Sequence, residues 1–326
     1  MMAKGSDLLR VENLKTHFHA RRGVVRAVDG VSFEVRKGET LGLVGESGCG
    51  KSMTMLSIIR LVPEPGGRIV GGKIMFEGED LVQKREGEMR RIRGKEIAII
   101  LQDPLTSLNP AYTIGNQVGE AVSLHQGKRG KALLETVTHA LRLVRIPAPE
   151  TRVRDFPHQM SGGMRQRVCG AMAISCRPAL LIADEPTTSL DVTTQAQYLH
   201  LLKQLQEELG FGMILVSHDL GIVANICDRV AVMYAGRIVE TGDTAELFSH
   251  PVHPYTRALL DCVPRLDEEK RDLTTIEGQP PDLSQELPGC RFLPRCQEKV
   301  DGCGQGYPPE SLVGPRHYVS CWRESP

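Results

Sequence analysis

The sequence predicts an α/β fold with a mostly parallel sheet, an antiparallel β region before it, a helical subdomain and a small loop-rich, cysteine-containing C-terminal module. Short apolar strands alternate with helices from Thr40 onward, a pattern typical of parallel sheets. The stretch from Pro104 to about Ala173 is mostly helical, which predicts a helical subdomain at about 104–173. Beyond Cys262, prolines crowd a segment with few large apolar residues. We therefore divide the chain into a main domain, 1–262, and a module, 263–326.

The N-terminal region supplies the first two elements. Residues Leu9 to Val35 alternate apolar and polar side chains around Gly23, which predicts an antiparallel sheet. Thr40 to Val44 then forms a short buried strand that runs into GESGCGKS and a helix through Arg60. Strand, glycine-rich loop and helix in this order predict a phosphate-binding loop.

The phosphate loop is the first candidate nucleotide site. Its glycines let backbone N–H groups approach phosphate oxygens, Lys51 suits the β and γ oxygens, and Ser52 suits Mg²⁺. The candidate nucleotide-binding set is the whole loop, Gly45, Glu46, Ser47, Gly48, Cys49, Gly50, Lys51 and Ser52.

Polar residues follow three further strands. Asp184 and Glu185 follow the strand from Ala179 to Ala183, where Asp184 can hold Mg²⁺ and Glu185 can act as a general base toward water. Gln102 follows the strand at Ile97 to Leu101, and His218 follows the strand at Gly212 to Val216. Taken alone, two acids after a strand indicate a solvated turn or a cap, and a single histidine or glutamine indicates a structural side chain.

Three more positions complete the candidate site. Ser161, Gly162 and Gly163 stand at a predicted helix start, where backbone N–H groups can bind anionic oxygens. Asp191 can cap a helix that ends at Gly210. Phe18 in isolation favours a core position, although an aromatic face can also stack on adenine.

Bulk composition excludes several classes of protein. Over 326 residues, Lys+Arg and Asp+Glu are equal at 40, so no basic excess favours nucleic acid or anionic lipid. The longest apolar runs are far shorter than the roughly 18 residues that cross a bilayer, and no signal peptide is evident. We expect a protein made in the cytosol, where nine cysteines indicate thiols or metal ligands.

The motifs GESGCGKS, Gln102, SGGMRQR, LLIADEP, SLD and His218 occur in an order that resembles the ATP-binding-cassette (ABC) ATPases, over about Leu8 to Leu260. The phrases QDPLTSLNP, ADEPTTSLDVTTQAQ, VMYAGRIVETG and HPYTRALL are similar to the oligopeptide/dipeptide importer group, which includes nickel importers. The resemblance implies a P-loop (RecA-like) core and ATP hydrolysis.

The same resemblance implies residue roles. It implies a head-to-tail dimer in which Ser161 to Gly163 of one subunit complete the site on the phosphate loop of the other. Phe18 would stack on adenine, Gln102 would sense Mg²⁺ and face membrane subunits, and His218 would contact the γ-phosphate. The resemblance also implies that Asp191 of the SLD motif is one of the nucleotide-binding residues. Met164 replaces the Gln of the wider family, a departure common to the importer group.

Four of the cysteines gather in the tail. They are Cys290, Cys296, Cys303 and Cys321. Free structural thiols are one interpretation, and the spacing lacks both the C-x₂-C pairs of zinc modules and the tight run of bacterial ferredoxins, so spacing names no metal. Some members of the importer group hold a [4Fe–4S] cluster on four cysteines at comparable positions, and the resemblance therefore implies that cluster rather than zinc.

The functional prediction is the ATP-hydrolysing motor subunit of a prokaryotic importer for di- or oligopeptides or a related solute, peripheral to the cytoplasmic face of the inner membrane. Its predicted cofactors are ATP, Mg²⁺ and the cluster. Its predicted partners are two permease subunits, an identical or paralogous second ATPase, and an extracytoplasmic solute-binding protein, without nucleic acid.

Two alternatives remain. A soluble cassette ATPase acting on nucleic acid or ribosomes, with a zinc or interaction tail, is disfavoured by a single cassette, no long coiled-coil insertion and no basic stripe. A non-enzymatic regulatory subunit is disfavoured by the presence of Glu185.

Overall fold

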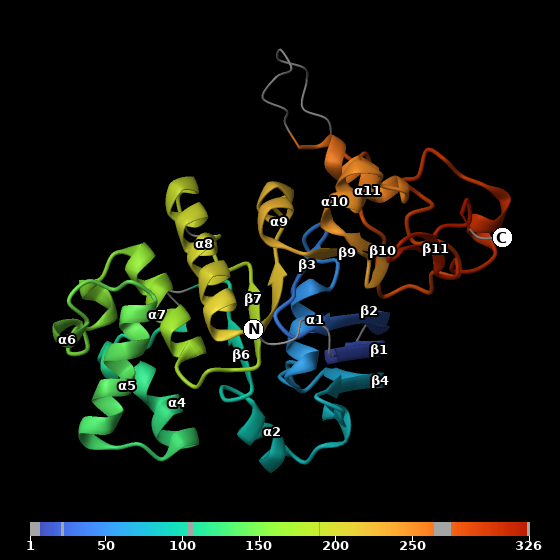
Figure 1. The fold of residues 1–326 in the computed structure, drawn as a ribbon. Coiled ribbons are helices and arrows are strands. Elements are labelled where there is room, and N and C mark those ends of the chain that lie inside the picture. The colour runs from blue at the N-terminus through green and yellow to red at the C-terminus, as the bar shows by residue number, and fades with distance from the viewer. Residues whose placement is uncertain (1–6, 21–22, 104–106, 189, 264–274, 325–326) are drawn as a thin grey trace. The chain divides into compact units, whose positions relative to one another are not determined.

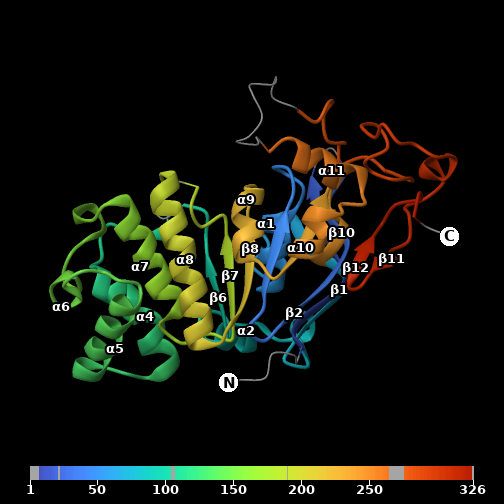
Figure 2. The same ribbon diagram turned by 45° about the horizontal axis from the view of Figure 1, so that its top comes forward.

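A computed structural model describes residues 7–20, 23–103, 107–188, 190–263 and 275–324. The chain falls into two compact units. The first unit comprises Met1–Leu8, Val35–Thr40 and Gln83–Val216, and the second comprises Leu9–Glu34, Leu41–Val82 and Ser217–Pro326. Figures 1 and 2 show the helices and strands of both units as ribbons.

Parallel strands form the centre of the first unit. Strand β7 (Leu180–Asp184) pairs in parallel with β6 (Ile97–Ile100) and with β8 (Gly212–Val216). Every residue of β7 and β8 is buried. Such unbroken apolar strands are typical of a parallel sheet covered on both faces, as the sequence predicts.

Helices make up most of the first unit. They are α2 (Glu86–Ile92), α4 (Ile114–Gln126), α5 (Gly130–Leu143), α6 (Pro149–Arg152), α7 (Gly162–Ile174) and α8 (Val192–Leu209), with a 3₁₀ turn at Pro157–Gln159. Helix α4 contacts both α5 and α7, the green segments of Figure 1, so the structure shows the predicted helical subdomain. Its first predicted residues, 104–106, lie outside the described residues. Helix α8 ends at Gly210 in the left-handed conformation, φ 77°, as the sequence predicts.

An antiparallel sheet lies mainly in the second unit. Its order is β2 (Gly23–Arg36), β1 (Asp7–Ala20), β4 (Gly67–Phe76) and β5 (Glu79–Asp80), followed by a 3₁₀ turn at Leu81–Gln83. Strands β1 and β4 are antiparallel, with Leu9 opposite Phe76. The predicted N-terminal β region is thus present, with β4 and β5 as additions.

The second unit also contains the strand that precedes the phosphate loop and two strands from later in the chain. Strand β3 (Thr40–Val44) has the predicted bounds and pairs in parallel with β9 (Arg229–Tyr234), which is antiparallel to β10 (Arg237–Asp243). The helices of this unit are α1 (Lys51–Ile58), α9 (Leu220–Ile226), α10 (Thr244–Ser249) and α11 (Pro254–Asp261). A Cβ at Gly42 would lie 2.8 Å from Val223 Cγ1, so this glycine lets α9 pack closely on β3.

The tail is more regular than the sequence predicts. Strands β11 (Ser311–Gly314) and β12 (His317–Val319) form an antiparallel hairpin, and β12 pairs with β10 through Glu240 and Val319. A 3₁₀ turn covers Asp301–Gly304. The tail therefore extends an existing sheet, which supplies the supporting surface that its own small core lacks.

Among the described residues, none of the helices combines the length and the apolar composition needed to cross a bilayer.

Candidate functional site

The phosphate loop joins β3 to α1 in the second unit, and its glycines have backbone angles that disfavour other residues. Their φ values are 150° at Gly45, 77° at Gly48 and 108° at Gly50. A Cβ at Gly45 would lie 2.1 Å from Met233 O, and one at Gly50 would lie 2.4 Å from Ala27 O. A Cβ at Gly48 would meet nothing within 4 Å. Backbone packing therefore forbids side chains at positions 45 and 50, whereas position 48 is constrained by φ alone.

Lys51 is directed back over the loop. Its side chain is buried, and Nζ donates to Gly45 O at 2.8 Å and to Glu46 O at 3.0 Å. The ammonium thus lies beside backbone carbonyls that an anionic phosphate oxygen could replace. Ser52 is exposed in the first turn of α1, while burial raises the pKa of the Cys49 thiol. Cys49 is consequently a protonated packing residue of the loop.

Glu46 is fixed by two residues that the sequence analysis did not identify. Its backbone N–H donates to Tyr255 Oη at 2.9 Å. Its carboxylate accepts two hydrogen bonds from Arg295, at 2.6 and 3.0 Å. Tyr255 lies within HPYTRALL and Arg295 lies between Cys290 and Cys296, both far from position 46 in the sequence. No local pattern pairs residues 249 positions apart.

Phe18 and His218 also belong to the second unit. Phe18 is half-buried on β1 opposite Gly67, where an added Cβ would lie 2.7 Å from Phe18 Cε1. His218 is exposed, and the residues before and after it are both hydrogen-bonded. Ser217 donates its backbone N–H to Leu43 O, and its hydroxyl accepts the N–H of Asp219, which caps α9. The turn that carries His218 is therefore held by the residues on either side of it.

The acidic pair lies in the first unit at the end of β7. Asp184 is buried, and Glu185 has φ 45°, a left-handed conformation that costs about 1–3 kcal/mol in a residue other than glycine. The backbone N–H of Glu185 donates to Val216 O at 3.0 Å. Its Oε2 accepts Gln102 Nε2 at 2.9 Å and Thr188 Oγ1 at 3.3 Å. The structure therefore brings Gln102 and Glu185 together, and it adds Thr188, which the sequence analysis missed.

The second glycine pair begins α7. The Ser161 hydroxyl accepts the backbone N–H of Met164 at 3.3 Å and so caps the helix. Ser161 is exposed, and a Cβ at Gly162 would meet nothing within 4 Å. The start of this 13-residue helix thus presents backbone N–H groups, which favour an anion.

Asp191 caps α8, as the sequence predicts. Its carboxylate accepts the N–H of Thr194 at 3.0 Å and the Thr194 hydroxyl at 2.7 Å, and these hydrogen bonds hold the pKa of Asp191 below its ordinary value. Ser189 of the SLD motif lies outside the described residues.

The four tail cysteines are thiols, as are the other five cysteines of the chain. Burial, with smaller contributions from the neighbouring Cys303, Cys321 and Cys296, raises the pKa of Cys290 to about 11, and these contributions place the four thiols near one another. Among residues 7–324 with their gaps, however, no three His, Cys, Asp or Glu side chains have the geometry of a metal site. The structure thus does not support the [4Fe–4S] cluster that the family resemblance implies.

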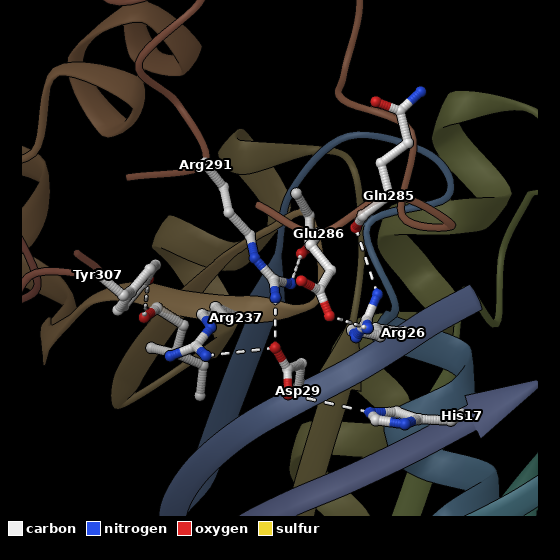
Figure 3. Close-up of polar contacts among 10 residues, drawn as sticks. His17, Arg26, Asp29, Arg237, Gln285, Glu286, Arg291 and Tyr307 are labelled. Carbon is white, nitrogen blue, oxygen red and sulfur yellow. Dashed lines mark hydrogen bonds and ion pairs between the residues drawn. The ribbon is translucent and has the colours of Figure 1, made fainter. Parts of the chain in front are cut away.

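Arginines anchor the tail to the rest of the second unit, as Figure 3 shows. Arg291 donates to the carboxylate of Asp29 and to Ala235 O, and Arg237 donates to the same carboxylate at 3.2 Å. Burial would raise the pKa of Asp29, but the charges of Arg291 and Arg237 hold it below its ordinary value. Arg26 donates to Gln285 O, and its guanidinium lies 3.2 Å from Glu286.

Comparison with known proteins identifies two regions. Residues 28–188 match the family described as ABC transporter, and residues 239–303 match the family described as oligopeptide/dipeptide transporter, C-terminal region. The probable peptide ABC transporter ATP-binding protein y4tR of Sinorhizobium fredii is 49% identical over 99% of this chain and 96% of its own length. The dipeptide transport ATP-binding protein DppD of Bacillus subtilis is 49% identical over 97% of this chain and 94% of its own length.

Solved structures share the fold. The ATP-binding cassette MJ0796, in a dimeric post-hydrolysis state bound to ADP and Pi, superposes with a TM-score of 0.65 at 23% identity, covering 73% of this chain and 99% of that one. The protein cbiO1 of Clostridium perfringens, part of the ABC transporter complex cbiONQ, gives a TM-score of 0.64 at 27% identity, covering 76% and 92%. These superpositions confirm the predicted fold class.

Proposed function

The chain belongs to the family of ABC transporter ATPases, and on that basis we propose that it is the ATP-hydrolysing subunit of a prokaryotic importer for dipeptides, oligopeptides or a related solute. The observation that carries the proposal is the presence, in one chain, of the cassette and of the oligopeptide/dipeptide transporter C-terminal region. Relatives named for peptide transport match nearly the whole chain at 49% identity. None of the comparisons favours the alternative acting on nucleic acid.

The proposed site uses the residues singled out above. Lys51 and the backbone N–H groups of the phosphate loop bind the β- and γ-phosphates. Bound Mg²⁺ would neutralise charge that develops on the phosphates, and Ser52, Gln102 and Asp184 are the oxygen donors suited to it. Phe18 stacks on adenine, His218 contacts the γ-phosphate, and Asp191 joins the nucleotide-binding set. Ser161, Gly162 and Gly163 act on the nucleotide bound by a second ATPase subunit.

Glu185 is the proposed general base, and two neighbours hold its carboxylate in place. Its Oε2 accepts hydrogen bonds from Gln102 Nε2 at 2.9 Å and from Thr188 Oγ1 at 3.3 Å. These hydrogen bonds fix the orientation of the carboxylate that would accept a proton from the attacking water. Gln102 is also among the residues that would hold Mg²⁺, so the proposed base and a proposed metal ligand are hydrogen-bonded to each other.

The proposed assembly contains two membrane permease subunits, a second ATPase that is identical or paralogous, and an extracytoplasmic solute-binding protein. Association with the permeases would hold this chain at the cytoplasmic face of the inner membrane. Family membership supports an ATPase that works beside separate membrane subunits.

We also propose the [4Fe–4S] cluster as a hypothesis about the tail. Cysteine sulfurs are the donor type that such a cluster needs. The sulfur of Cys296 accepts the backbone N–H of Glu298 at 3.4 Å. Backbone hydrogen bonds also hold the pKa of Cys290 and Cys321 below what burial alone would give. Hydrogen bonds to sulfur are typical of iron–sulfur ligands. The described side chains lack metal-site geometry, so no step of the mechanism depends on the cluster.

The decisive experiment replaces the proposed base. Glu185→Gln should leave ATP binding nearly intact while lowering turnover by about 10²–10⁴, the range for loss of a general base, and should trap a closed dimer. ATPase rate and nucleotide affinity are measured on the assembled transporter, with Lys51→Ala as a control that loses nucleotide binding. Wild-type turnover in Glu185→Gln would remove Glu185 from this role. Uptake of labelled dipeptide into vesicles that hold the transporter tests the solute.

A further inference from the structure

We propose that Arg295, a residue of the C-terminal tail, is a positioning residue of the phosphate loop that sets the affinity of the loop for ATP through Glu46. The inference rests on the proposed function in taking ATP as the ligand of this loop. It gives the tail a part in nucleotide binding that is separate from any metal on the cysteines.

The contact between Arg295 and Glu46 is bidentate. Arg295 Nη1 lies 2.6 Å from Glu46 Oε2, and Nη2 lies 3.0 Å from Oε1. The Arg295 side chain is only 3% exposed, so this ion pair is shielded from solvent on the arginine side. A planar guanidinium that meets a carboxylate with two parallel hydrogen bonds fixes the orientation of both groups.

The rest of the guanidinium is held as well. Arg295 Nε donates to Glu277 O at 2.9 Å, and Nη2 donates to Ile276 O at 3.1 Å. Nη1 also reaches Tyr234 Oη at 3.4 Å. Because the tail backbone and β9 hold the guanidinium in place, little side-chain freedom remains for it to lose when it orients Glu46.

Glu46 is held at its backbone N–H, its carbonyl and its carboxylate. Its N–H donates to Tyr255, its carbonyl accepts from Lys51, and its carboxylate is held by Arg295. The residue lies between Gly45 and Ser47, inside the loop whose N–H groups receive the phosphates. A change in the Glu46 side chain is therefore transmitted directly to the phosphate-binding backbone.

Arg295 also cancels a charge that would oppose ATP. A phosphate loop must attract an anion, yet this loop carries a carboxylate at its second position. With Arg295 present, the two cations Arg295 and Lys51 outnumber the single anion Glu46. Without Arg295, the negative charge of Glu46 would offset the positive charge of Lys51 and repel the phosphates.

The turn that carries Arg295 is packed against aromatic residues close to the loop. Phe292 meets the ring of Tyr234 edge-on at 5.2 Å between centroids and lies 5.3 Å from the ring of Tyr255, the residue that holds the Glu46 N–H. Cys290 and Cys296 stand at either end of this turn. Docking of the tail and positioning of Glu46 therefore depend on the same packing.

The test measures binding of Mg²⁺-ATP to the purified full-length chain by calorimetry. Arg295→Gln should weaken binding roughly tenfold, which corresponds to about 1.4 kcal/mol. In a Glu46→Gln background, the same Arg295→Gln change should cost less than about twofold, because no carboxylate is left to neutralise. Arg295→Lys keeps the charge and loses the bidentate geometry, so its Kd for ATP should lie between those of the wild type and Arg295→Gln. In the assembled transporter, Arg295→Gln should raise the KM for ATP by about the same factor and change kcat by less than about twofold.

The matched control is Arg291→Gln in the same turn. Arg291 anchors the tail to Asp29 and Ala235, and neither of these residues belongs to the loop (Figure 3). This variant should lower the melting temperature while changing the Kd for ATP by less than about twofold. Equal loss of affinity in both arginine variants would overturn the proposal, because general loosening of the tail would then explain the effect. An unchanged Kd in Arg295→Gln, or an equal penalty in the Glu46→Gln background, would also overturn it. Failure of the wild-type chain to bind ATP would overturn the proposed function as well.

Discussion

His253, the residue that caps α11, should make the stability of the protein depend on pH. Its side chain is 1% exposed, and its Nδ1 accepts the backbone N–H of Tyr255 at 3.0 Å. Burial, followed by the positive charge of Arg257, lowers the pKa of His253 to about 3. On the other side, Glu240 accepts the backbone N–H of His253 at 3.0 Å rather than a ring proton. The folded protein thus holds a neutral imidazole, and protonation would remove the acceptor that the cap needs.

This pKa makes stability depend on pH. In the unfolded chain His253 titrates at about 6.5, so between about pH 6.5 and 3 the unfolded state binds a proton that the folded state does not. The contribution of His253 to stability is therefore complete above about pH 6.5 and is lost as pH falls through this window. With 1.36 kcal/mol per pKa unit, the loss at pH 5 is about 2 kcal/mol.

The assay follows urea unfolding by the fluorescence of Trp322, the single tryptophan of the chain, which lies in the same compact unit as His253. Wild type and His253→Asn are compared at pH 7.5 and pH 5.0. Asparagine can also accept the cap hydrogen bond but does not titrate. The stability difference between the two proteins should shift by about 2 kcal/mol toward the variant at the lower pH. Because the other titratable groups are the same in both proteins, an identical pH dependence would refute the buried neutral imidazole.

Three further predictions concern the loop, the dimer and the tail. Gly45→Ala should abolish ATP binding, since its Cβ would lie 2.1 Å from Met233 O. Gly48→Ala has open space around its Cβ and should cost only about 1 kcal/mol of stability, because of its positive φ. Calorimetry measures ATP binding and thermal unfolding measures stability, and equal losses in the two variants would contradict the packing argument. Ser161→Arg in every ATPase subunit should abolish stimulation of ATPase rate by the permeases, and full stimulation would rule out the shared site. Cys303→Ser should lose the brown colour and the roughly four irons and four sulfides per chain expected after anaerobic purification, with ATP binding retained; zinc, or colourless wild-type protein with an ordered tail, would refute the cluster.

Elements whose signals are local could be predicted from the amino-acid sequence. The bounds of β3 and β8, the cap at Asp191 and the end of α8 at Gly210 all agree with prediction. Buried strands are marked by apolar runs, and helix ends by residues within a few positions of them. The glycine pattern from Gly45 to Ser52 predicted the loop for the same reason, because its backbone angles are set by the residues that occupy it.

Contacts between side chains that are distant in the sequence could not be predicted and are seen only in the folded chain. Glu46 pairs with Arg295, 249 positions away, and Asp29 pairs with Arg291, 262 positions away. The composition of the tail predicts loops, whereas its strand β12 pairs with β10, with Val319 opposite Glu240. Many arginines and carboxylates along the chain have the chemistry to pair, and local sequence cannot choose among them. The choice is made when the whole chain packs, because only then does one arginine lie within hydrogen-bonding distance of one carboxylate and become shielded from water.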